Sequence, residues 1–175
     1  MANAKLLTRP EDFKRLGISP DKIEAWEDSR RNNNHAQNNF EGWYFDALLD
    51  DGSTAIIQWF TKAGRDILKK EDCPRISVKI TAPDGTYYHK DFKFDAKDTY
   101  YGKDQCDLKF GPHSFKGDLK NYQIHMEPTE GVGADLTLES MATPYRPGTS
   151  YIQFDSEDEF FTWLSVVPKG KVAGT

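Results

Sequence analysis

The sequence predicts an all-β fold, a single antiparallel β-barrel preceded by a short helical arm. Its 175 residues are enough for one domain with its own core. Aromatic residues make up 13% of the chain, and their side chains suit half-buried strands and the walls of apolar cavities. From Phe40 onward, short apolar stretches alternate with turn residues, which is the pattern of a barrel or a sandwich.

Residues 1–39 are predicted to form the arm. Pro10 suits the first turn of a helix, and Gly17 is expected to end it. Ser19 can cap a second short helix, because a proline follows it in the first helical position. The polar stretch 30–39 is rich in Asn and is expected to be a loop that leads into the barrel domain.

The barrel domain is expected to span residues 40–175, and its first hairpin is predicted at 41–49 and 53–60. A two-residue Asp-Gly turn between these strands would place Tyr44 opposite Trp59. The pairing of every other residue in the hairpin follows from this register.

This register assigns the polar residues of the hairpin to opposite faces. Tyr44, Asp46 and Trp59 would share one face, and Trp43 and Gln58 would share the other. Both faces would then be apolar, and each would hold one polar side chain. A hairpin buried on two sides fits a barrel wall that is covered from outside.

The second hairpin is predicted at 75–81 and 86–94. A three-residue loop with Gly85 in the left-handed conformation would set Ile80 beside Tyr88, and it avoids placing two lysines opposite each other. Further short strands are predicted at 97–102, 106–110, 114–117, 121–127, 134–140, 150–155 and 160–167. This number of strands fits a closed barrel that holds one small ligand, and a β-sandwich of similar length also fits.

The charge balance excludes several kinds of partner. The chain has 23 Lys and Arg residues against 28 Asp and Glu, a formal net charge of −5, which argues against nucleic acid and anionic lipid surfaces. No apolar run approaches the roughly 20 residues that cross a bilayer, and the N-terminus lacks the apolar core of a secretory signal. We therefore expect no stable membrane insertion and a cytoplasmic location.

Motifs for common cofactors and metals are missing from the sequence. It has no phosphate-binding loop, dinucleotide fingerprint, nucleophile elbow or H-E-x-x-H motif, and its four histidines are isolated from one another. Cys73 and Cys106 lie too far apart for a C-x-x-C pair. The sequence thus predicts no cofactor, no metal and two free thiols.

Asp46 is the candidate catalytic residue. An acid between Tyr44 and Trp59 on an apolar face would be poorly solvated, which raises its pKa and keeps it partly protonated. It could then protonate an electron-rich double bond, and the rings of Trp43, Tyr44 or Trp59 could stabilise the resulting cation. The alternative is that Asp46 accepts hydrogen bonds and is structural. Gln58, if buried, needs partners from the protein or from a ligand.

Seven segments in order along the chain resemble the AttH and hydroxyneurosporene synthase (carotenoid 1,2-hydratase) family. They include the run Glu41-Gly42-Trp43-Tyr44-Phe45-Asp46-Ala47 and the stretches 106–111, 115–122, 134–138, 144–148, 161–163 and 167–175. Members of this family contain two lipocalin-like β-barrel domains. The resemblance therefore implies that this chain is a first lipocalin-like domain, that the second domain is absent, and that a homodimer could take its place.

The resemblance also implies a function. It indicates an apolar ligand, isoprenoid or polyketide-like, and a metal-independent hydratase, cyclase or isomerase that acts by proton transfer. Asp46 would be the acid, and Trp43, Tyr44, Gln58 and Trp59 would line the ligand site. The alternative is a non-catalytic lipid-binding or carrier module with the same residues.

Overall fold

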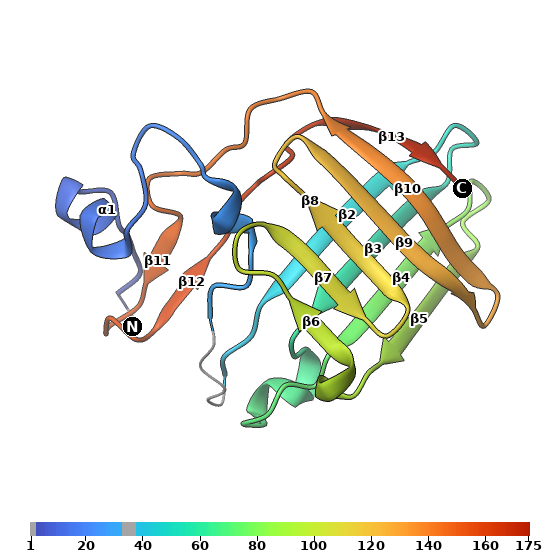
Figure 1. Cartoon of the computed structure of the whole chain (residues 1–175), viewed down its shortest axis with the longest axis horizontal. Coiled ribbons are helices and arrows are strands. Elements are labelled where there is room, and N and C mark those ends of the chain that lie inside the picture. Colours follow the sequence, from blue (N-terminus) through green and yellow to red (C-terminus); the bar gives the residue numbers. More distant parts are fainter. Residues whose placement is uncertain (1–2, 33–37) are drawn as a thin grey trace.

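A computed structural model describes residues 3–32 and 38–175, and it confirms the all-β class (Figure 1). The predicted closed barrel is not confirmed. No sheet formed by the described residues closes on itself, and the two larger sheets pack face to face around a shared core. Part of the polar stretch predicted as a loop at 30–39 lies outside the described residues.

The arm begins with a short strand β1 (Lys5–Leu6) and the helix α1 (Pro10–Leu16). As predicted, Pro10 is in the first turn of α1, and Gly17 ends the helix with a φ of 67°. The arm and a small three-stranded sheet lie together at one end of the molecule, and the C-terminus lies at the other (Figure 1).

The second helix predicted at Ser19 is wrong. The Ser19 hydroxyl accepts the N–H of Asp21 in a tight turn, instead of capping a helix. The backbone carbonyl of Ser19 also accepts a hydrogen bond from the Arg146 guanidinium, in place of the backbone N–H that it would accept in a helix. A 3₁₀ turn, η1 (Ala25–Asp28), follows later, and the N–H of Glu24 before it donates to the side chain of Glu27.

The first large sheet has four antiparallel strands in chain order: β2 (Gly42–Leu48), β3 (Thr54–Phe60), β4 (Arg75–Thr81) and β5 (Tyr87–Lys93). A 3₁₀ turn η2 (Gly64–Leu68) lies between β3 and β4. The predicted second hairpin is confirmed: Ile80 pairs with Tyr88, and Gly85 has a φ of 86°.

The second large sheet has six antiparallel strands and begins after the 3₁₀ turn η3 (Ala96–Asp98). In spatial order its strands are β13 (Gly170–Gly174), β10 (Val132–Ser140), β9 (Asn121–Thr129), β8 (His113–Gly117), β7 (Cys106–Phe110) and β6 (Thr99–Tyr101). The sequence pattern did not predict β13. The third sheet contains β1, β11 (Tyr151–Gln153) and β12 (Phe160–Thr162).

The first hairpin has a different turn from the predicted one. Its loop contains three residues, Asp50 to Gly52, and is closed by a 2.8 Å hydrogen bond from the Leu49 N–H to the Ser53 carbonyl. Gly52 takes the left-handed conformation at a φ of 85°, which a bulged three-residue loop requires. The expected two-residue turn is therefore wrong.

This extra loop residue shifts the pairing of the two strands by one position. Trp43 pairs with Trp59, and Asp46 pairs with Ile56, where the predicted register had Asp46 opposite Ile57. Because side chains alternate along a strand, a shift of one residue exchanges the faces. Only one face of the hairpin is buried, so the expectation of burial on both sides is also wrong.

The core lies between the two large sheets. The four-stranded sheet contributes Trp43, Phe45, Ile57, Trp59, Ile76, Val78 and Phe92, and the six-stranded sheet contributes Cys106, Leu108, Phe110, Phe115, Tyr122, Ile124 and Met126. Trp59 is fully buried, and its ring meets that of Phe110 edge-on at 5.0 Å. Aromatic side chains thus fill the space between the sheets.

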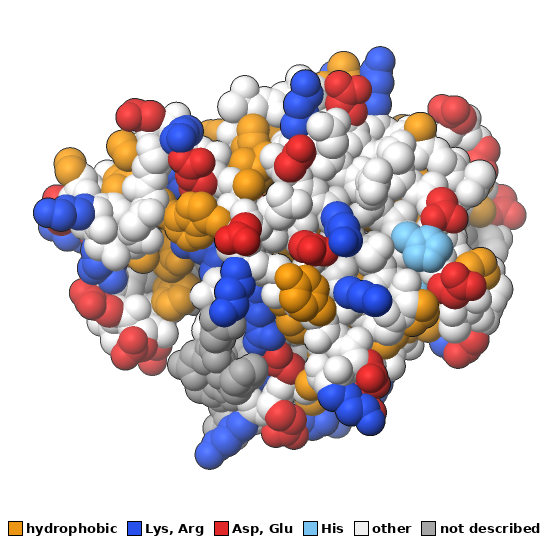
Figure 2. All heavy atoms as spheres, in the orientation of Figure 1, with side chains coloured by type: hydrophobic (Ala, Val, Ile, Leu, Met, Phe, Trp, Pro, Cys, Tyr) orange, Lys and Arg blue, Asp and Glu red, His pale blue; other side chains and the backbone are white. Residues whose placement is uncertain are grey.

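Charged side chains of both signs are spread over the face in Figure 2, with small apolar areas between them. No helix within residues 3–32 and 38–175 is long and apolar enough to cross a membrane. Cys73 and Cys106 are both free thiols.

Candidate functional site

The first hairpin separates the five residues predicted to form one site. Trp43 and Trp59 point into the core, where they are 8% and 0% exposed. Tyr44, Asp46 and Gln58 lie on the outer face of the four-stranded sheet, and Tyr44 is 56% exposed. The structure therefore does not place Trp59 beside Tyr44 and Asp46, because the register differs by one residue.

The outer face does not give Asp46 the apolar surroundings that the acid role assumes. Asp46 is exposed to solvent. Gln58 lies directly opposite Tyr44 and accepts a 3.1 Å hydrogen bond from the Lys79 ammonium, so its amide oxygen has a protein partner. The roles of these residues in catalysis and ligand binding stay predictions.

Ser77, His89, Asp91 and Arg75 form a polar network on the same outer face. The Nε2 atom of His89 lies 3.1 Å from the Ser77 hydroxyl and 3.2 Å from the Asp91 carboxylate. A relay from serine through histidine to aspartate needs both ring nitrogens, and here one nitrogen makes both contacts. Arg75 also donates to Asp91 at 3.1 Å, so the network is built as a surface charge cluster.

A partly buried acid is found instead at the end of the core, where η1 places Asp28. The Tyr122 hydroxyl donates to Asp28 Oδ2 at 2.7 Å, and the indole Nε1 of Trp43 donates to the Asp28 backbone carbonyl at 2.9 Å. Trp43 belongs to the four-stranded sheet and Tyr122 to the six-stranded sheet. Asp28 therefore bonds to both sheets.

Burial makes Asp28 the acid with the properties that the sequence analysis assigned to Asp46. Desolvation raises the pKa of Asp28 from 3.8 to about 7, although the hydrogen bond from Tyr122 opposes this shift. Desolvation also raises the pKa values of the Tyr122 phenol and the Cys106 thiol, so both stay protonated. No cationic side chain among the described residues pairs with Asp28.

Aromatic rings continue from Asp28 into the core. The Trp43 ring lies 6.0 Å from that of Tyr101, and the Tyr122 ring lies 5.9 Å from that of Phe115. Gly117 pairs with Tyr122 across β8 and β9, and a Cβ atom at Gly117 would lie 1.9 Å from the Tyr122 ring. The phenol can therefore lie against β8 only because residue 117 has no side chain.

Sequence reasoning missed Asp28 for a physical reason. Its hydrogen-bond partner Tyr122 is 94 residues away, and no local pattern connects the two. The hairpin pattern also pointed to an acid on a strand, whereas Asp28 belongs to the arm. The local run Trp26-Glu27-Asp28 carries no signal that marks Asp28 as partly buried.

A buried ion pair holds η1 in place. Arg146 and Glu27 form an ion pair in which both side chains are almost completely buried. The Arg146 guanidinium also donates to the carbonyls of Ser19, Lys22 and Gly148. Each of its three guanidinium nitrogens donates to a protein acceptor, so Arg146 is a structural anchor between the arm and the loop before β11.

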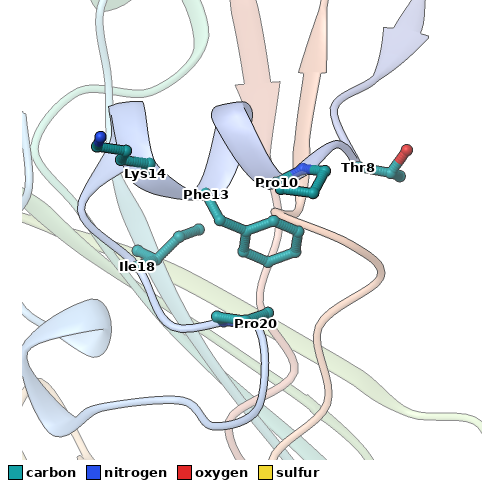
Figure 3. A pocket seen from close by; sticks show the side chains of 6 residues that line it. All are labelled: Thr8, Pro10, Phe13, Lys14, Ile18 and Pro20. Atoms are coloured by element: carbon teal, nitrogen blue, oxygen red, sulfur yellow. The ribbon is translucent and has the colours of Figure 1, made fainter.

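The arm also carries a shallow apolar hollow of about 410 Å³. Figure 3 shows the Phe13 ring directed from α1 toward the loop that carries Ile18 and Pro20. Lys14 is the charged residue in its lining, which is otherwise formed by Thr8, Pro10, Phe13, Ile18 and Pro20. The hollow could accept a small apolar molecule.

Within the part of the chain that the structure describes, no group of three or more His, Cys, Asp or Glu side chains is placed to hold a metal ion. The fold and the site define an antiparallel β protein with two large sheets and one small one, and with a partly buried acid at the aromatic end of the core between the large sheets. No family model, no curated protein and no solved structure matches the chain.

Proposed function

We propose that this chain is a lipocalin-like domain that binds an apolar, unsaturated small molecule, isoprenoid or polyketide-like, as part of a metal-independent hydratase, cyclase or isomerase. The observation that supports this proposal is Asp28, a partly buried acid that desolvation gives a pKa of about 7 and that contacts the aromatic side chains of Trp43 and Tyr122. In the proposed function, Asp28 takes the role of proton donor that the sequence analysis gave to Asp46.

The proposed reaction would transfer one proton from Asp28 to the substrate and later return a proton to Asp28. The neutral Asp28 carboxyl transfers its proton to a carbon of the double bond, which forms a C–H bond and leaves a carbocation and a carboxylate. The ring of Trp43 would stabilise the cation, and the Tyr122 hydroxyl would stabilise the carboxylate. In a hydration, water then adds to the carbocation and gives one of its protons to the Asp28 carboxylate. In a cyclisation, a second double bond of the substrate attacks the carbocation, and the cyclised cation finally loses a proton to Asp28.

Product formation with a panel of carotenoids, terpenes and polyenes tests this proposal. Asp28→Asn should lower turnover by about 10²-fold or more, because a general acid contributes that much, and should retain the bound ligand. Asp46→Asn is the matched control and should keep turnover. Turnover in the wild type should also fall above about pH 7 as Asp28 loses its proton. An active Asp28→Asn variant together with an inactive Asp46→Asn variant would show that the proton donor is Asp46 and not Asp28.

A non-catalytic lipid carrier is the second candidate, and the apolar hollow beside α1 favours it. Native mass spectrometry of the chain purified without detergent would report a retained apolar ligand and the number of subunits together. For a carrier, Phe13→Ala should release the ligand, and no variant should form a product. A dimer in the same spectrum would support the homodimer that the family resemblance implies.

A further inference from the structure

We propose that the small sheet of β1, β11 and β12 docks an extended segment of another protein, one that is apolar with basic residues at its end, and that this segment pairs with the free edge of β12. The docking site goes beyond the proposed function, because it involves neither Asp28 nor the core between the large sheets. It combines an unpaired strand edge, an exposed apolar face and an acidic turn.

β12 presents an unpaired backbone edge. It is the last strand of the three-stranded sheet and pairs with β11 on one side. The Phe154 N–H donates to the Glu159 carbonyl at 2.7 Å, which makes these two residues a hydrogen-bonded pair of the antiparallel ladder. Bonding alternates along a strand, so the N–H and C=O groups of Phe160 and Thr162 point away from β11. An added strand would satisfy these groups.

One face of the small sheet is apolar and open. Leu6, Ile152 and Phe161 lie directly opposite one another across the three strands. Trp163, two residues after Phe161, continues this row by the alternation of side chains. Leu6, Phe161 and Trp163 are 37%, 47% and 60% exposed, so the row faces solvent. Contiguous exposed apolar side chains of this kind mark interaction sites.

The opposite face of the small sheet is already covered by the arm. The Phe160 ring lies 4.9 Å from the Tyr151 ring, and the Arg31 guanidinium lies over the Tyr151 ring and donates to its hydroxyl. A docked segment would therefore direct its apolar side chains to the other face, where Leu6 and Phe161 lie.

An acidic turn determines the charge of the partner. Asp155, Glu157, Asp158 and Glu159 are exposed and immediately precede β12. The Arg15 guanidinium approaches Glu157 at 3.9 Å, whereas Asp158 and Glu159 form no ion pair with another described residue. Basic side chains at the end of a docked strand would lie beside these carboxylates and offset their charge.

Charge also decides between another protein and a second copy of this chain. If two copies of β12 paired about a two-fold axis, with Phe161 opposite its own copy, each acidic turn would lie along residues 163–167 of the other copy. That stretch contains no lysine or arginine. The acidic turn would also be repelled by an anionic lipid surface. A segment that brings its own basic residues is therefore the occupant that fits.

Binding of a peptide tests the docking site. The probe is the fluorescently labelled peptide Thr-Val-Thr-Ile-Thr-Val-Lys-Lys-Lys, whose lysines reach the acidic turn when the peptide lies antiparallel to β12. At low salt it should bind with saturation, and a peptide with glutamates in place of the lysines should bind at least about tenfold more weakly. Equal binding of both peptides, or no saturable binding of the lysine peptide, would overturn the proposal.

Hydrogen exchange on the full chain locates the bound peptide. The amides of Phe160 and Thr162, which point to the free edge, should be protected about tenfold more in the complex than in the free chain. Two versions of the peptide, N-methylated at opposite sets of alternate amides, should differ in affinity because one set faces β12. Unchanged protection of both amides in a saturated complex contradicts docking at this edge.

Variants identify the apolar and the acidic contacts. Trp163→Ala should raise the Kd of the lysine peptide about tenfold, because aromatic side chains carry much of the energy of such contacts. Tyr87→Ala is the matched control, since Tyr87 is 58% exposed on the edge strand β5 of another sheet, and it should leave the Kd unchanged. Asp158→Asn with Glu159→Gln should remove the preference for the lysine peptide. Equal effects of Trp163→Ala and Tyr87→Ala would refute the site.

Two further results would identify a different occupant and overturn the proposal. One is a dimer of the chain alone in which the Phe160 and Thr162 amides are protected without peptide, because a second copy would then hold the edge. The other is binding to phosphatidylcholine vesicles that Trp163→Ala abolishes, with no binding of the lysine peptide, because the apolar row would then contact lipid.

Discussion

Asp28 and Asp46 differ because of where the chain places their carboxyl groups. Asp46 is on a strand with a buried inner face, but its own side chain points to solvent. Asp28 is on a short turn that is pressed against the end of the core, and it has a phenol as its hydrogen-bond donor in place of a cation. Burial without a countercharge favours the neutral form of an acid.

The first prediction concerns the stability of the Asp28→Asn variant. The pKa of Asp28 is raised on folding, so its contribution to stability is present at low pH and is lost as the pH rises from about 4 to about 7. Asparagine cannot lose a proton, so the stability of the variant relative to the wild type should rise by about 2 to 3 kcal/mol as the pH rises from 5 to 8. Urea unfolding at the two pH values measures this difference. Equal pH dependence in both proteins would contradict it.

At the scale of the elements, turn geometry decides which residues meet. Both predicted hairpins have three-residue loops with a left-handed glycine, Gly52 in one and Gly85 in the other. The sequence pattern predicted the second loop because the shorter turn would have paired two lysines. In the first hairpin no charge repulsion opposed the shorter Asp-Gly turn, so the predicted register was one residue away from the real one.

Gly52→Ala tests the loop of the first hairpin. Alanine at a φ of 85° is strained, so the substitution should lower the free energy of unfolding by about 1 kcal/mol. Gly133→Ala does not serve as a control because backbone atoms crowd that position. Exposed Asp50→Ala in the same loop is the better control and should have a smaller effect in thermal and urea unfolding. Equal losses for both variants would argue against the role of the left-handed glycine.

At the scale of the whole molecule, the sequence predicted the strands well and their assembly poorly. Alternating residues and turn signals are local, and they located nine of the strands in the two large sheets. They missed β13, a short strand of small residues in the sequence Gly-Lys-Val-Ala-Gly. Whether the sheets close into a barrel depends on contacts between distant strands, and so does the meeting of Asp28 with Tyr122.

The anchoring of the arm is a property of the whole molecule, because Arg146 and Glu27 are 119 residues apart. Arg146→Met leaves the Glu27 carboxylate buried without its partner, so it should lower the free energy of unfolding by about 3 to 5 kcal/mol. The double variant Glu27→Gln with Arg146→Met should recover part of this loss, and urea unfolding of the wild type, the two single variants and the double variant measures it. Independent, additive losses would show that the two charges do not act as a pair.

The close contact between Gly117 and Tyr122 makes a residue without a side chain part of the acid site. Any other amino acid at position 117 would push the phenol away from β8 and from the Asp28 carboxylate, since even a methyl group overlaps the ring. Tolerance to substitution should therefore be as low at this glycine as at the acid itself. The limits on sequence change around the site therefore extend to β8, the strand next to the one that carries the Tyr122 hydroxyl.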